Sequence, residues 1–185
     1  MNDTFLNGVD VDKVEEVIKS VNDNSKYFND VCSGIVKEYS ESLDGLMSDI
    51  YVSCVRDNDV SMETLQSYYL ELSNMIYFMN ERLEALGVKS SMAESAYKEV
   101  YSKNVIIESK DKDEKGKSKV TVSELQAKAA LGAQYENVVS SIYDHAYKVV
   151  KGKVSSAQDM MNTLRRIISS RTEEMRLSSN VGGQN

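Results

Sequence analysis

The sequence predicts an all-α protein: an elongated helical hairpin or bundle with long C-terminal helices. None of its 185 residues is proline, the residue that most often interrupts a helix. Apolar residues recur three and four positions apart along most of the chain, which is the spacing of one helix face. Hydrophobic residues make up 41% and charged residues 28% of the chain, a balance typical of folded amphipathic helices.

Two helices are expected in the first part of the chain. Residues 11–21 carry one apolar face, and Asp10 or Asp12 is the expected N-cap. The polar run 22–25 loosens the pattern, which then resumes over residues 28–54 as a long helix.

The next segment is expected to pair with that long helix as a hairpin. Ser61 is a candidate N-cap, and the apolar pattern that follows it stops at Gly87, a common helix-ending residue. Ser91 and Glu94 have the spacing of a capping box, which predicts that a third helix starts there.

Residues 108–119 are almost entirely charged or small, and we expect a flexible loop. Its flanks, residues 105–107 and 120–122, are β-branched. Two alternatives are open for them: a small β-ribbon around residues 104–122, or two helix ends.

Thr121 and Glu124 form a second capping box, which opens the longest apolar stripe of the chain. Gly152, between two lysines, is the one position where we expect this helix to break or kink. The sequence thus divides into an acidic helical bundle (1–107), a charged loop (108–119), a long C-terminal helical segment (120–178) and a tail (179–185).

Charge is distributed unevenly along the chain. Residues 1–82 hold 16 acidic and 6 basic residues, a net charge of −10, and the remainder has a net charge of +3. The basic C-terminal part has three interpretations: an anion-binding end, a head that meets the tail of a neighbouring copy, or a solvated surface.

The residues that usually carry catalysis are sparse. There is one histidine, His145, and the two cysteines, Cys32 and Cys54, lie on apolar helix stripes where a buried thiol is expected. No serine has the setting of a nucleophile elbow. We therefore expect no enzymatic activity, no metal site and no cofactor. We also expect no membrane span and a cytoplasmic location.

An apolar strip near the C-terminus predicts self-association. An isolated helix would leave this strip in water at a cost of about 25 cal/mol per Å². The alternative is burial of the strip inside one subunit. The strip consists of Met160, Met161, Leu164, Ile167 and Ile168.

The second half of the chain resembles the UvsY-type recombination mediators of tailed phages. The resemblance covers residues 62–177 and is one of layout: a charged loop, the aromatic midpoint Gln134-Tyr135-Glu136, the Lys-Gly-Lys interruption, and a final stretch containing Leu-Arg-Arg-Ile-Ile-Ser-Ser-Arg. It implies a helical oligomer that binds single-stranded DNA and a recombination protein in a host cytoplasm. The residues implicated would be Lys148, Lys151, Lys153, Arg165, Arg166 and Arg171.

Three functions therefore compete. The first is a non-enzymatic phage accessory protein that binds single-stranded DNA, which the tyrosines interleaved with lysines over residues 97–153 also favour. The second is an acidic helical module that binds a basic protein, for example an inhibitor that mimics DNA to block a host nuclease. The third is a structural or scaffolding helical oligomer. The strongly acidic first 60 residues favour the second over the first.

Overall fold

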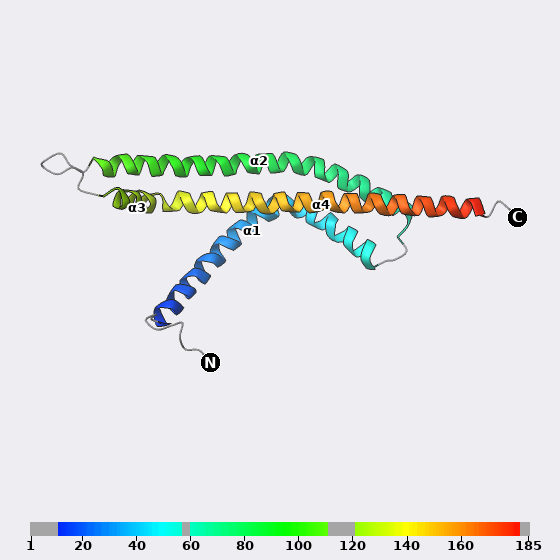
Figure 1. Cartoon of the computed structure of the whole chain (residues 1–185), viewed down its shortest axis with the longest axis horizontal. Coiled ribbons are helices and arrows are strands. Elements are labelled where there is room, and N and C mark those ends of the chain that lie inside the picture. Colours follow the sequence, from blue (N-terminus) through cyan, green and yellow to red (C-terminus); the bar gives the residue numbers. More distant parts are fainter. Residues whose placement is uncertain (1–10, 57–59, 111–120, 182–185) are drawn as a thin grey trace.

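The computed structural model describes residues 11–56, 60–110 and 121–181, and it confirms the all-α prediction (Figure 1). The described helices are α1 (Val11–Arg56), α2 (Met62–Ser109), α3 (Val122–Gly132) and α4 (Gln134–Val181). Helix α2 lies antiparallel beside α3 and α4, and α1 is bent, with its middle against this pair and its N-terminal part leading away (Figure 1). None of the described helices is long and apolar enough to cross a membrane.

One apolar core is shared by α1, α2 and α4. Fully buried side chains come from each helix, and burial of such a side chain contributes about 1.5–3 kcal/mol. The acidic N-terminal part and the C-terminal segment are therefore distinct in sequence but share one core. The largest of these side chains are Leu43, Ile50, Leu65, Leu72, Met79, Leu86, Val150 and Leu164.

The prediction of two helices before residue 56 is wrong, because α1 runs unbroken through residues 22–25. The apolar positions before and after this polar run fall on the same helix face, so one continuous helix serves both. Ser25 donates through its hydroxyl to the carbonyl of Asn22 (3.0 Å), within the helix. Asp12 lies in the first turn and does not cap α1, and Asp10 is outside the described residues.

Helix α2 also continues where the sequence predicted an end and a new start. Ser61 caps it as expected, accepting from the backbone N–H of Thr64 at 3.1 Å. Gly87 does not end the helix, since α2 passes through Gly87 and Ser91. A Cβ atom built at Gly87 would lie 3.2 Å from a ring carbon of Tyr147 on α4. The glycine permits close packing of α4, which explains it without a helix end.

The β-ribbon is not present in the described residues. Residues 105–107 belong to α2, and Thr121 caps α3 through the predicted capping box, in which Glu124 accepts from the backbone N–H of Thr121 at 2.9 Å. Lys128 donates to Glu108 across the two helices (3.1 Å), so these segments meet as helix ends. Residues 111–120, most of the predicted loop, lie outside the described residues.

The C-terminal stripe breaks at Ala133 and not at Gly152. Asn104 of α2 donates to the carbonyl of Ala129 (3.5 Å), the group that would accept the Ala133 N–H in a continuous helix. The Ala133 N–H bonds to the carbonyl of Ala130 instead. Gly132 leaves room for the Asn104 side chain, since a Cβ atom at Gly132 would lie 2.6 Å from the Asn104 amide nitrogen. At Gly152, α4 continues without interruption.

The tail begins later than predicted, because α4 reaches Val181. The hydroxyls of Ser178 and Ser179 donate to carbonyls three residues earlier, at 2.8 and 2.9 Å, which satisfies backbone groups near the helix end. Residues 182–185 lie outside the described part of the chain.

Substitutions at two glycines test this account of the helices. A Cβ at Gly152 would meet nothing within 4 Å, so Gly152→Ala should raise the free energy of unfolding. We expect a gain of about 0.5–1 kcal/mol, the usual difference between glycine and alanine in a helix. Gly87→Val should lower it by about 1–3 kcal/mol, because the added carbons meet the Tyr147 ring. Urea denaturation followed by circular dichroism measures both; a lower midpoint for Gly152→Ala would contradict a continuous α4.

Candidate functional site

The basic residues implicated by the sequence do not share one surface of α4. Lys153 donates to a carboxylate oxygen of Asp44 (2.5 Å) and to the hydroxyl of Ser40 (3.1 Å), both on α1. Arg171 donates to the carbonyl of Val60, in the linker between α1 and α2. Both side chains are partly buried, and these contacts connect α4 to α1 and to the linker that follows it.

The other basic residues lie on an exposed side of α4. Lys148 pairs with Asp144 on the same helix (2.7 Å), and the ammonium of Lys151 lies 5.9 Å from the centre of the Tyr147 ring. Arg165 and Arg166 border a shallow polar groove. Lys148 and Arg166 are separated by about 27 Å along the helix, at about 1.5 Å per residue. This side can present separated cations to an extended anion, but it forms no enclosed site.

The apolar strip expected to join two copies is covered within the chain. Leu164 is fully buried, and the other members pack against the same core. Ile168 and Arg165 border a mainly apolar groove with Tyr69 and Leu70 of α2. The strip is therefore partly covered within one chain, while self-association through its exposed parts stays a prediction.

A different apolar surface lies on the outer face of α2, and we name it the α2 ridge. Its side chains are 59–73% exposed, and their positions fall on the face opposite the buried leucines of α2. Two of them, Tyr77 and Phe78, make an edge-to-face ring contact with centroids 5.5 Å apart. The ridge consists of Leu70, Tyr77, Phe78, Val88 and Met92.

Acidic side chains lie among those of the α2 ridge. Glu63, Glu81 and Glu84 are exposed and fall on the same side of α2, and Glu81 and Glu84 lie between Phe78 and Val88. The surface therefore combines apolar anchors with negative charge. Sequence reasoning missed this ridge because it followed only the buried stripe of α2. The recurrence of exposed apolar residues on the opposite face, as at Leu70 and Tyr77 seven positions apart, is the signal that would have revealed it.

The two cysteines and the single histidine, the other residues that could carry chemistry, lie against neighbouring side chains of the chain. Burial raises the pKa of the Cys32 thiol, and it raises the pKa of Cys54 despite the opposing charge of Arg171. A raised pKa reduces the reactive thiolate at neutral pH. His145 makes a ring contact with Phe28 of α1, with centroids 6.2 Å apart. Among the described residues, no group of histidine, cysteine and carboxylate side chains is arranged to hold a metal ion.

Comparison with known proteins gives no relative: no family model, no curated protein and no solved structure matches the chain. The functional argument therefore depends on the surfaces described above.

The Lys153 contact can be tested by a double-mutant cycle. We expect Lys153→Ala and Asp44→Ala to show a coupling free energy of about 0.5–1 kcal/mol, because both side chains are partly exposed and solvent screens the pair. The exposed pair Lys148 and Asp144 is the control, with an expected coupling of about 0.3–0.5 kcal/mol. Urea denaturation of the single and double variants measures both values. Zero coupling between Lys153 and Asp44 would show that this pair does not stabilise the contact of α1 with α4.

Proposed function

We propose that this protein is a non-enzymatic, acidic helical module that binds a basic protein partner through the α2 ridge. The observation that carries the proposal is the set of exposed apolar side chains on the outer face of α2, interspersed with glutamates. Monomeric proteins rarely leave a row of this kind in water, and such rows commonly mark interaction sites.

The composition of the α2 ridge fits a binding surface. Tyr77 and Phe78 are large aromatic side chains, the type that dominates binding energy when a partner desolvates them. Anchors spaced along one face of a helix match the mode in which a helix enters an apolar groove or packs on another helix. A partner should therefore offer an apolar groove or helix face.

The charges predict the rim of that partner. Glu63, Glu81 and Glu84 would face lysine or arginine side chains, which would increase the association rate and discriminate against acidic proteins. The net charge of −10 over residues 1–82 extends this attraction beyond the contact itself.

Site-specific photo-cross-linking tests the proposal. A photoreactive phenylalanine analogue at Tyr77 should cross-link to a basic protein in the native cell, and Phe78→Ser in the same chain should reduce the yield several-fold. The analogue at Met175, an exposed apolar position near the end of α4, is the matched control and should give little product. Equal products at both positions would contradict the proposal. A product containing only a second copy of this chain would favour the scaffolding oligomer.

Single-stranded DNA binding is a second candidate, favoured by one observation. Lys148, Lys151, Arg165 and Arg166 are all exposed on α4, and Arg165 and Tyr69 line the same groove. Cations that contact phosphates, with an aromatic ring for base stacking, are the elements of a single-strand site. Lys153 and Arg171 are less exposed and already make contacts within the chain, so we leave them out of this proposed site.

Salt dependence tests this second candidate. If the exposed cations bind DNA, the affinity for an oligothymidine should fall with a log–log slope of about −0.7 per phosphate contacted. Alanine at all four positions should flatten the slope by up to about 2–3 units. The combination Lys153→Ala with Arg171→Ala is the control, since it removes positive charge that serves an internal contact. No binding by the wild-type chain at low salt would reject the DNA function.

A further inference from the structure

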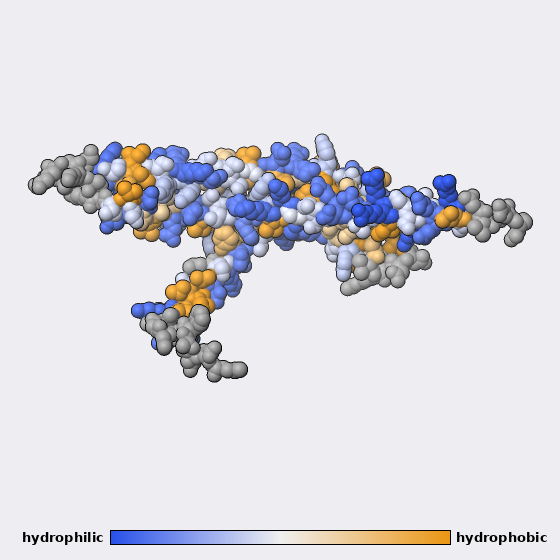
Figure 2. Space-filling model, viewed as in Figure 1, coloured by the Kyte–Doolittle hydropathy of each residue, from blue (hydrophilic) through white to orange (hydrophobic). Residues whose placement is uncertain are grey.

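The N-terminal part of α1 carries an apolar face that nothing covers in the described structure. We name residues 12–21 the α1 arm. Its aliphatic side chains are 40–61% exposed, and Figure 2 shows an apolar patch on this projecting segment. The same face of α1 is buried from Cys32 onward, where α4 covers it. The exposed side chains of the arm are Val14, Val17, Ile18 and Val21.

A second uncovered stripe lies at the start of α4 and the end of α3. Leu131, Tyr135 and Val138 are 73%, 85% and 42% exposed. In α4, Tyr135 and Val138 are on the side that faces α1 further along, where His145 meets Phe28 and Lys153 meets Asp44. We name Leu131, Tyr135 and Val138 the α4 stripe.

The two uncovered surfaces match in register within α4. At the Phe28–His145 contact, the two residues are 117 positions apart (145 minus 28). The contacts of Lys153 with Ser40 and Asp44, further along, join residues 113 and 109 positions apart, so 117 is the offset nearest the α1 arm. At that offset Ile18 and Val21 lie opposite Tyr135 and Val138, the two members of the α4 stripe that follow the break at Ala133.

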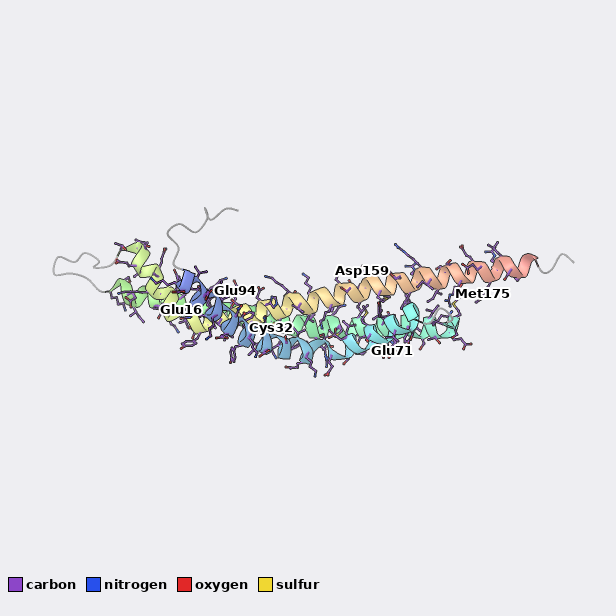
Figure 3. All side chains as sticks on the ribbon, turned by 90° about the horizontal axis from the view of Figure 1, so that it is seen from below. Glu16, Cys32, Glu71, Glu94, Asp159 and Met175 are labelled. Atoms are coloured by element: carbon purple, nitrogen blue, oxygen red, sulfur yellow. The ribbon has the colours of Figure 1, made fainter. Side chains whose placement is uncertain are left out.

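The direction of the α1 arm also suits this pairing. Viewed from below, the α1 arm, which carries Glu16, overlaps the start of α4 (Figure 3). Figure 1 shows the separation between them in the perpendicular direction. Bending the N-terminal part of α1 toward the body would therefore bring the α1 arm near the start of α4.

The sequence contains a suitable hinge. Residues 22–25, Asn-Asp-Asn-Ser, directly follow the α1 arm, and such side chains compete for backbone hydrogen bonds and favour departures from helix. Ser25 already donates to the carbonyl of Asn22. This run interrupts an otherwise apolar face at the one place where α1 would need to bend.

We propose that the α1 arm closes onto the α4 stripe of its own chain, hinging at residues 22–25 and extending the established contact between α1 and α4. Closure would place Ile18 and Val21 against Tyr135 and Val138 and remove these side chains from water. A tethered segment has a high effective concentration, which favours the arm of the same chain over that of a second copy. The open form would expose both surfaces. The proposal does not depend on the α2 ridge.

Disulfide trapping tests the closure. In full-length chains with Cys32→Ala and Cys54→Ala, the pair Ile18→Cys and Tyr135→Cys should form a disulfide within one chain on mild oxidation, since cysteines link only when their Cα atoms come within about 7 Å. The control pair is Lys19→Cys and Tyr135→Cys, in which Lys19 lies on the opposite face of the arm. We expect the first pair to link several-fold faster, at a rate independent of protein concentration. Equal rates, no linkage, or linkage only between chains would overturn the proposal.

A second measurement keeps the native cysteines. The chain contains no tryptophan, so Tyr135→Trp supplies a single emission reporter. Closure should give blue-shifted emission, and adding Ile18→Asp and Val21→Asp should shift it to the red. Identical emission from the two proteins would show that the α1 arm does not cover position 135.

Discussion

The close packing of α2 against α4 is the contact on which the rest of the structure depends. Both helices are long, and their fully buried side chains, among them Leu72, Leu86, Val150 and Leu164, belong to a single core. Gly87 lets the Tyr147 ring approach the α2 backbone near the middle of this contact. Both helices are amphipathic and uninterrupted there, so the apolar face of each helix is buried by packing against the other helix. The pair forms the straight body against which α1 lies (Figure 1).

Helix α1 is held to this body by fewer and more polar contacts. Lys153 of α4 reaches the buried Ser40 and the adjacent Asp44, and Arg82 of α2 donates to the carbonyl of Tyr39 at 3.4 Å. The Ser40 hydroxyl also bonds to the carbonyl of Val36 (2.9 Å), a local contact that often accompanies helix bending. These contacts lie in the middle of α1. The N-terminal part of α1 therefore has the freedom that the α1 arm needs.

The surfaces left open by this packing are mainly rows of exposed side chains on the helices. The thiols are sheltered, and the grooves between the helices are shallow and open. Exposed apolar side chains, in contrast, occur in ordered rows on α2, on the α1 arm and on the α4 stripe. The resemblance to phage recombination mediators implicated six basic residues of α4. Two of them, Lys153 and Arg171, make contacts within the chain, and the other four lie on its exposed side.

The sequence by itself determined the helical class, the caps at Ser61 and Thr121, and the burial of the main apolar stripes, because these depend on local spacing and local hydrogen bonds. Only the tertiary structure decided where helices end. Gly87 resembled a helix end but makes room for Tyr147, and at the break near Ala133 the side chain of Asn104, from α2, bonds to the Ala129 carbonyl. It likewise decided that Lys153 and Arg171 serve internal contacts, and that Leu164 is buried within one chain. In each case a partner distant in sequence sets the outcome, and periodicity along one helix carries no information about that partner.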